Sequence, residues 1–319
     1  MQIILSVYKI VFKCKGESMQ IKKLAILTSG GDAPGMNSAI FGAYQECENK
    51  NIELFGAIGG YDGLIDNKFI KIDYSLLSGR INRGGSVLKS GRSPRFMQKV
   101  YINRAVKNLK FNNFDGLIVL GGDGSLRGAI SLRDAGVNVV AIPATIDNDL
   151  NFSYTLGYDT ATNNIVNAID NILDSLNAFN YGAVIKIMGR DCPDLINCVA
   201  EAVDTNLVVK DKDFDLKDLI KKVNQVKNKK TCPPIVLVLE DCADTTSLSS
   251  TLQNECKIQM RPHILGYIQR GGSPCAYDRR YGITAGKMAV NTLKNRECVM
   301  IGICKDELVK KPFEECFKI

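Results

Sequence analysis

A chain of 319 residues is long enough for about two domains and for a core that needs no disulfide or metal staple. Its 45% hydrophobic and 24% charged residues are typical of a soluble globular protein, and no run is apolar enough to predict a membrane span. The net charge of +7 comes from scattered Lys and Arg rather than a dense basic block. This pattern disfavours nucleic-acid binding and suits small polyanionic substrates such as nucleotides and sugar phosphates.

The eleven cysteines show no spacing typical of a zinc site, and His263 is the single histidine. Scattered thiols in a chain of this size indicate a reducing compartment, so we expect a cytoplasmic protein. Residues 1–18 precede the first strong strand–loop–helix pattern and lack the basic start and cleavage site of a signal peptide. We interpret them as an N-terminal extension or as the product of a misassigned start at Met1 instead of Met19.

Apolar strand-like runs alternate with helical patterns along the chain, which predicts βαβ units and a parallel sheet. Strands are expected at 24–28, 52–58, 69–74, 116–120, 137–142, 183–187, 234–239 and 299–303. Helices are expected from 36 to 47, 97 to 109, 126 to 134, 159 to about 172 and 213 to 227, before 256, and from 278. Asp159 is expected to cap the long mid-chain helix.

The stretch IPATIDND at 142–149 follows a β-branched run and should lie at the carboxyl end of a buried strand, where open α/β sheets bind ligands. Thr145, Asp147 and Asp149 alternate, so in an extended backbone they share one face. Grouped carboxylates can bind magnesium or act as a general base. The alternative is an Asx-rich turn that caps the next helix.

Two glycine-rich loops, at 29–35 and 121–125, each leave a strand, open a helix and contain an aspartate. Backbone N–H groups at a helix N-terminus favour phosphate, and glycine allows a close approach. The second loop is not a dinucleotide fingerprint, because Arg127 stands where the last glycine is needed, and no P-loop pattern is present. The loops therefore predict a nucleotide site of another design.

Five motifs together resemble the bacterial-type, ATP-dependent 6-phosphofructokinase family. They are TSGGDAPGMN at 28–37, GGDGS at 121–125, PATIDND at 143–149, MGR at 188–190 and LGYIQRGGSP at 265–274, in that order. The resemblance covers about 21–308 and implies two similar Rossmann-like α/β lobes, with mostly parallel sheets and the active site between them. It implies an ATP-binding lobe from 19–158 plus about 270–300, and a sugar-phosphate lobe from 159–269 plus about 301–319.

The resemblance implies transfer of the γ-phosphoryl group from Mg-ATP to the 1-hydroxyl of fructose 6-phosphate. Asp147 would be the base, assisted by Thr145 and Arg190, while Asp123 and Asp149 would hold Mg²⁺. The implied nucleotide-binding residues are Gly31, Arg92, Ser93, Gly122, Asp123, Gly124 and Ser125. The implied sugar-phosphate residues are Thr145, Ile146, Asp147, Met188, Gly189, Arg190, Glu240, Arg261, Tyr267, Ile268, Gln269 and Arg270.

The sugar side departs from the family pattern at two positions. Tyr181 stands where an Arg is usual and Tyr267 where a His is usual, which predicts a raised KM for fructose 6-phosphate. Neighbouring subunits commonly complete this site in the family, through Arg261 here, which implies a homotetramer. Phe41, Gln45 and Leu173 replace arginines that bind effectors in regulated relatives, so control by ADP and phosphoenolpyruvate should be reduced.

The phosphoryl donor is predicted from side-chain size. Pyrophosphate-using relatives carry Asp and Lys where Gly124 and Ala144 stand, and small residues leave room for the rest of ATP. The alternatives are a non-catalytic or regulatory paralogue, a pyrophosphate-dependent enzyme, or a kinase of another ketose phosphate. A lipid or NAD kinase would fit the GGDG loop alone, but the later motifs disfavour it.

Overall fold

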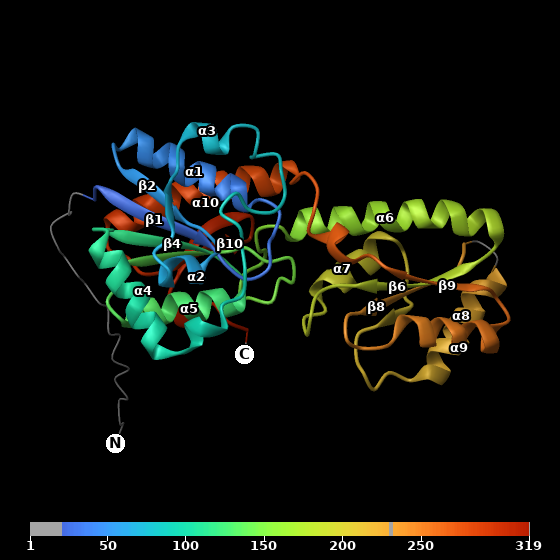
Figure 1. Cartoon of the computed structure of the whole chain (residues 1–319). Helices are drawn as coiled ribbons and strands as arrows, with labels where there is room; N and C mark the ends of the chain where they lie inside the picture. Colours follow the sequence, from blue (N-terminus) through green and yellow to red (C-terminus); the bar gives the residue numbers. More distant parts are fainter. Residues whose placement is uncertain (1–20, 230–231, 319) are drawn as a thin grey trace, which may run out of the picture.

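The computed structural model describes residues 21–229 and 232–318, so the predicted extension at 1–18 lies outside the described residues. Two α/β lobes lie side by side, each built on its own sheet (Figure 1). The expected α/β class with mostly parallel sheets is confirmed. No helix within the described part of the chain is long and apolar enough to cross a membrane.

The first lobe contains a seven-stranded sheet. Its order is β11-β10-β5-β4-β1-β2-β3, with β1 at Lys23–Thr28, β2 at Glu53–Ala57, β3 at Phe69–Lys71, β4 at Gly116–Gly121, β5 at Val139–Pro143, β10 at Met300–Cys304 and β11 at Glu307–Lys311. The central strands are parallel, and the edge strands β3 and β11 are antiparallel. The carboxyl ends of β1, β4 and β5 therefore meet at one edge of the sheet, where the predicted ligand loops begin.

Helices cover both faces of this sheet. They are α1 (Met36–Asn49), α2 (Tyr61–Ile65), α3 (Tyr74–Leu77), α4 (Lys99–Phe111), α5 (Asp123–Asp134) and α10 (Ala276–Lys294), with a short 3-10 helix, η1, at Pro94–Met97. Leu24 and Ile26 of β1 belong to the core under α1 and α10, whereas Ala25 and Leu27 belong to the core over α4 and α5. This alternation along one strand shows why the run is apolar throughout: both of its faces are buried.

The second lobe contains a parallel four-stranded sheet. Its order is β7-β8-β6-β9, with β6 at Gly182–Ile187, β7 at Val208–Val209, β8 at Ile235–Leu239 and β9 at Met260–Ile264. It is covered by α6 (Tyr158–Phe179), α7 (Asp194–Ala202), α8 (Leu216–Lys229) and α9 (Thr245–Cys256). The 3-10 helix η2 (Gly266–Gln269) follows β9, and η3 (Phe313–Glu315) follows β11.

The lobes are joined where α6 and α10 begin. The Asp278 carboxylate of α10 accepts hydrogen bonds from Gly157 N at 2.7 Å and from Thr160 N at 2.9 Å. Gly157, in a left-handed conformation (φ 101°), is the N-cap residue of α6, so the prediction that Asp159 caps this helix was wrong. A carboxylate distant in sequence satisfies the N–H groups that a local cap would have served.

Three further element predictions are corrected by the structure. The strands β10 and β11 pair with the first sheet, whereas the sequence analysis assigned about 301–319 to the second lobe. The helix α5 begins at Asp123 rather than at 126, so the end of the predicted glycine-rich loop is helical. The strand β3 ends at Lys71, because Asp73 accepts a hydrogen bond from Leu76 N and starts α3.

Candidate functional site

The stretch that follows β5 forms a turn with two different faces. Ala144 and Ile146 lie in the apolar core, while Thr145 and Asp147 form the polar face, as the alternation predicts. Asp147 N donates to Thr145 Oγ1 at 3.2 Å, and Asn148 adopts a left-handed conformation with φ 52°. The next helix, α6, begins only at Tyr158 behind its own N-cap, so the turn does not cap a helix.

The Asp147 carboxylate is buried, that of Asp149 is half-buried, and both are incompletely paired. Asp147 is 3% exposed, and its Oδ2 atom lies 3.4 Å from Arg190 Nε. Among the described residues, neither Asp147 Oδ1 nor Asp149 Oδ1 has a hydrogen-bond partner. Burial raises the pKa of both carboxyl groups above the ordinary value of 3.8, and Arg190 opposes this rise in each case. Two unsatisfied buried acceptors indicate that this face is built to receive donors or a cation.

The second lobe supplies Arg190 from the loop that follows β6. Glu240 Oε1 accepts hydrogen bonds from Gly189 N at 3.3 Å and from Arg190 N at 2.8 Å. Gln269 Oε1 accepts one from Met188 N at 3.0 Å. In this structure Glu240 and Gln269 therefore hold the backbone of the loop, and Arg190 itself adopts φ 51° as it turns toward Asp147.

Arg270 connects the second lobe to the first glycine-rich loop. Its Nη1 atom would lie 3.1 Å from a Cβ atom on Gly31, so any larger residue there would press on the guanidinium group. The buried Nε atom of Arg270 has no hydrogen-bond partner in the described part of the chain. Nearby, Gly84 N donates to Gly272 O at 2.8 Å, which holds the segment after Arg270 against the first lobe.

The second glycine-rich loop leads into the N-terminus of α5, with Gly122 as the N-cap residue. A Cβ atom on Gly122 would lie 3.3 Å from Thr145 Cβ, whereas one on Gly124 would meet nothing within 4 Å. The hydroxyl of buried Ser125 faces Gly30 of the first loop. Asp123 pairs with Arg127 at 3.0 Å. The two loops and the turn after β5 therefore meet at one edge of the sheet.

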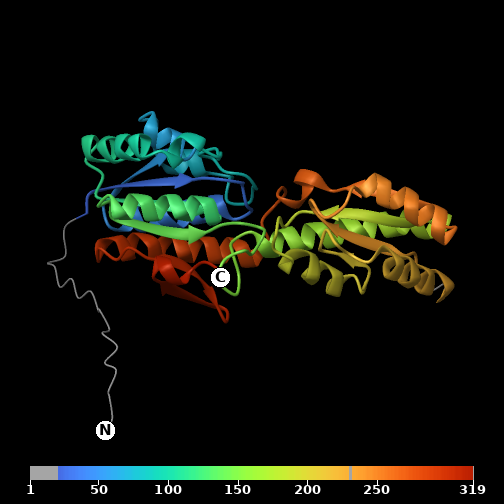
Figure 2. The same ribbon diagram turned by 90° about the horizontal axis from the view of Figure 1, so that it is seen from below.

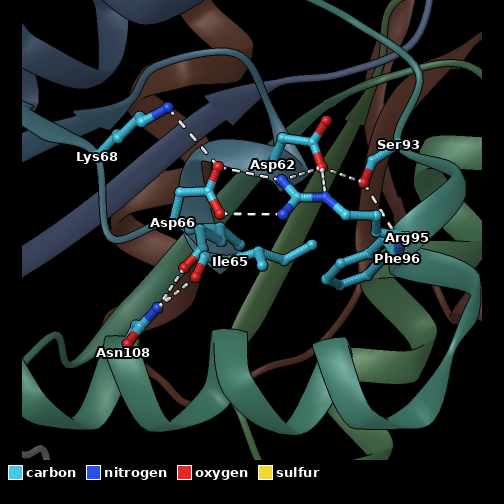
Figure 3. Close-up of polar contacts among 9 residues, drawn as sticks. Asp62, Ile65, Asp66, Lys68, Ser93, Arg95, Phe96 and Asn108 are labelled. Atoms are coloured by element: carbon cyan, nitrogen blue, oxygen red, sulfur yellow. Dashed lines mark hydrogen bonds and ion pairs between the residues drawn. The ribbon is translucent and has the colours of Figure 1, made fainter.

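The loop that carries Arg92 and Ser93 is fastened by a cluster that the sequence did not reveal (Figure 3). Arg95 Nε donates to Asp62 Oδ1 at 3.0 Å, and its Nη atoms donate to both oxygens of Asp66 at 3.1 Å. Ser93 Oγ also donates to Asp62 Oδ1, at 2.7 Å. The Ser93 hydroxyl is thus occupied within the cluster, while the Arg92 side chain is exposed.

Three predicted sugar-phosphate residues are placed differently from Arg190 and Glu240 in the single chain. Arg261 pairs with Ala183 near the amino ends of β9 and β6, at the opposite end of these strands from Arg190, and its guanidinium lies 5.0 Å above the Tyr181 ring. Tyr267 and Ile268 are 79% and 57% exposed. The contacts described above bring Asp147, Arg190 and Arg270 together with the glycine-rich loops. Arg261 lies at the other end of its strand, and the side chains of Tyr267 and Ile268 are exposed.

Two charged residues that sequence reasoning missed reach the turn. Lys318 Nζ donates to Asn148 O and to Asp194 Oδ2, each at 2.8 Å. Nothing in the sequence pairs a lysine near residue 318 with a turn at 148, because the contact depends on how the last strand hairpin packs.

The acidic residues fit a magnesium ion that arrives with a ligand. The described residues contain no group of three or more acidic, Cys or His side chains that could bind a metal alone. Mg²⁺, however, usually binds through one or two carboxylates together with substrate phosphates and water. The unpartnered Asp149 Oδ1 atom and the neighbouring Asp123 supply such a partial site.

Comparisons with known proteins decide the family. The family model described as phosphofructokinase matches residues 23–293. This chain belongs to the phosphofructokinase family. The resemblance seen in the five motifs is therefore confirmed over most of the chain.

Curated phosphofructokinases match nearly the whole chain. An ATP-dependent 6-phosphofructokinase of Hamiltonella defensa is 38% identical over 307 residues, which cover 94% of each chain. One from Clostridium botulinum is 39% identical over 306 residues, covering 94% of this chain and 95% of the relative.

Solved phosphofructokinase structures share the fold. The T-state phosphofructokinase of Pichia pastoris superposes with a TM-score of 0.86 at 26% identity over 92% of this chain, which spans only 35% of that longer chain. A pyrophosphate-dependent phosphofructokinase of Nitrosospira multiformis superposes with a TM-score of 0.83 at 14% identity, over 93% of this chain and 85% of the relative. The second likeness supports the fold alone.

Proposed function

We propose that this chain transfers the γ-phosphoryl group of ATP to the 1-hydroxyl of fructose 6-phosphate, giving fructose 1,6-bisphosphate in glycolysis. The observation that carries the proposal is the buried Asp147 carboxylate, with one oxygen facing Arg190 and the other without a hydrogen-bond partner in the described part of the chain. Relatives named for this reaction match 94% of the chain. A non-catalytic paralogue would have no chemical need to assemble this pair beside Asp149.

The reaction needs positioning and charge neutralisation more than covalent chemistry. The sugar 1-hydroxyl would approach the free Oδ1 atom of Asp147 and give up its proton there as the new oxygen–phosphorus bond forms. Because burial raises the pKa of Asp147, its carboxylate accepts a proton more readily than an exposed one does. Arg190 would neutralise charge on the transferred group, and the Thr145 hydroxyl would help to place it.

The nucleotide would lie over the loops of the first lobe, built from residues 19–158, from about 270–300 and from the C-terminal strands. Its phosphates would meet the backbone N–H groups of Gly122 and Gly124 at the start of α5. Ser125 N already donates to Gly122 O at 2.9 Å, so Ser125 would contribute its hydroxyl, with Gly31 and Arg92 beside it. Ser93 would contribute through its backbone, since its hydroxyl is occupied by Asp62. Mg²⁺ held by Asp123 and Asp149 would neutralise phosphate charge.

ATP is the proposed donor rather than pyrophosphate. The open space at Gly124 supports room for the remainder of a nucleotide. The sequence alone indicates room for ATP beside the small side chain of Ala144. In the structure the Ala144 methyl group is fully buried in the core. A lysine there would have to leave that core, so small size at Ala144 is also a packing requirement.

The second lobe, residues 159–269, would bind the sugar phosphate in an assembled homotetramer. Met188, Gly189 and Glu240 would line the sugar, and Ile146, Gln269 and Arg270 would flank it. We assign Arg261 to the site of a neighbouring subunit, because it lies at the amino end of β9, away from Asp147 in its own chain. Tyr267 and Ile268 are exposed just before Gln269 and would flank the sugar phosphate. The effector positions Phe41, Gln45 and Leu173 carry no charge, so we propose weak control by ADP and phosphoenolpyruvate.

The test is to measure fructose 1,6-bisphosphate formation with Mg-ATP and with magnesium pyrophosphate, and with tagatose 6-phosphate replacing the fructose ester. We expect turnover with fructose 6-phosphate and ATP, and a kcat/KM for pyrophosphate at least about 100-fold lower. Added ADP should leave the KM for fructose 6-phosphate nearly unchanged. No turnover with either donor would favour the regulatory paralogue.

A further inference from the structure

The C-terminal segment, residues 311–318, packs against the turn after β5 and the residues that follow it, although Lys311 and Asn151 are 160 residues apart in the sequence. Asn151 N donates to Cys316 O and Asn151 Nδ2 donates to Glu315 O, both at 2.8 Å. Leu150 and Phe317 form an antiparallel bridge, and Lys311 Nζ donates to Asn151 O at 2.6 Å. In Figure 2 the red C-terminal segment lies close to the junction of the two lobes.

The segment is also anchored by its side chains. Phe313 and Cys316 are completely buried in the first lobe. The Phe317 ring lies 4.5 Å below the guanidinium group of Arg127, which pairs with Asp123. These contacts fix the backbone that leads to Lys318, close to Asp123, one of the two residues proposed to hold Mg²⁺.

The Lys318 side chain bonds to both lobes. Its ammonium group contacts three acceptors: Asn148 O at 2.8 Å, Asp194 Oδ2 at 2.8 Å and Cys192 Sγ at 3.8 Å. Asn148 lies in the turn after β5, whereas Cys192 and Asp194 lie at the start of α7 in the second lobe. An ammonium group has three donors, so all of its hydrogen-bonding capacity converges here.

The remaining contacts close the cluster. Asn148 Nδ2 donates to Asp194 Oδ2 at 3.3 Å, and Cys192 Sγ donates to Asn148 O at 3.7 Å. Asn148 stands between Asp147 and Asp149, and Cys192 is two residues from Arg190. The cluster therefore links the turn that carries Asp147 to the loop that carries Arg190.

We infer that Lys318 is a positioning residue for phosphoryl transfer: by tying Asn148 to the start of α7, it sets the distance between Asp147 and Arg190. This inference rests on the proposed function for its kinetic consequence, while the structural clamp stands independently of it. Lys318 does not contact the predicted sugar or nucleotide residues, so its removal should lower kcat rather than weaken binding.

The test compares Lys318→Met with Lys310→Met, a matched control. Lys310 belongs to the same C-terminal region and forms a 2.7 Å ion pair with Glu297. The side chains of this pair are 31% and 40% exposed, and those of Lys318 and Asp194 are 42% and 37% exposed, so the two pairs are similarly accessible to solvent. Lys318→Met should lower kcat by about 10- to 100-fold with KM values within about threefold, as expected for a small misplacement of reacting groups. Lys318→Arg should recover part of the loss, and Lys310→Met should match wild type.

A double-mutant cycle and a measurement without turnover complete the design. Asp194→Asn should lower kcat similarly, and the double variant should lose less than the product of the two single losses. Amide hydrogen exchange in residues 144–152 should accelerate in Lys318→Met but not in Lys310→Met. Unchanged exchange and a kcat equal to that of Lys310→Met would overturn the clamp. If wild type shows no turnover, the proposed function fails, and exchange alone decides the clamp.

Discussion

Asp147 is subject to opposing influences on its pKa. Burial favours the protonated form, Arg190 and Arg270 favour the ionised form, and the nearby carboxylates of Asp149 and Glu240 again disfavour it. Burial dominates, so the pKa is raised. The ionised carboxylate that the reaction requires is therefore the form that the folded protein holds at a cost in stability.

This balance predicts that Asp147→Asn stabilises the fold at neutral pH. The unfolded chain titrates near 3.8 and the folded chain at higher pH, so protonation favours folding and the cost is greatest above the folded pKa. The Tm of Asp147→Asn should exceed that of wild type by a few degrees at pH 8, and the gap should close toward pH 4. Asp191→Asn, which removes an exposed carboxylate nearby, is the control. A lower Tm for Asp147→Asn at pH 8 would contradict this account.

The sequence predicted which side chains of the turn at 144–149 form its polar face, but not the geometry of its backbone. The alternation of Thr145 and Asp147 followed from strand period, and the structure keeps them on one face. The left-handed Asn148 and the contact from Lys318 depend on tertiary packing, which no local pattern encodes. Likewise, the family resemblance implied that Ser93 binds the nucleotide, yet its hydroxyl donates to Asp62, which lies in a helix that the sequence did not predict.

At the scale of elements, the ends of the strands in the second sheet divide the sugar-phosphate residues into two groups. Arg190 and Glu240 follow the carboxyl ends of β6 and β8, whereas Tyr181 and Arg261 lie at the amino ends of β6 and β9. The guanidinium of Arg261 over the Tyr181 ring is a cation–π contact at a partly exposed site, worth about 0.5–1 kcal/mol. Tyr181 thus orients Arg261 without adding positive charge.

We predict that Tyr181→Arg lowers the KM for fructose 6-phosphate by about tenfold or more, because a charge-assisted hydrogen bond is worth about 1.5–3 kcal/mol. Steady-state kinetics at saturating Mg-ATP measure the effect. Tyr181→Phe keeps the ring under Arg261 and should leave KM unchanged. An unchanged KM in Tyr181→Arg would show that this position does not face the sugar phosphate.

Secondary structure was predicted best where both faces of a strand are buried. Runs such as β4 and β8 are continuously apolar and bounded by glycine, proline or charged residues, so their positions could be predicted directly. The C-terminal pair β10 and β11 was assigned to the wrong lobe, because an apolar run does not specify its neighbour in a sheet. That choice is made by packing against β5 and by the contacts of residues 311–318 with the turn.

At the scale of the whole molecule, Arg261 lies too far along its strand from the Asp147 side of the sheet to serve the site of its own chain. Sharing of sites between subunits predicts complementation. Asp147→Asn and Arg261→Ala subunits should each have low activity at low fructose 6-phosphate. When they are mixed at random, about a quarter of the sites should combine two intact residues and recover activity. Activity that stays at the average of the two parents would show that each site is built within one chain.

The central claim is that Asp147 is the base in a site formed at the junction of the two lobes. It is tested most directly by the kcat of Asp147→Asn with fructose 6-phosphate and Mg-ATP, beside wild type and Asp191→Asn, with ATP binding measured separately. We predict a loss of about 10²- to 10⁴-fold in kcat, the usual contribution of general base catalysis, with an ATP dissociation constant within about threefold of wild type. A kcat of Asp147→Asn equal to that of Asp191→Asn would contradict the account.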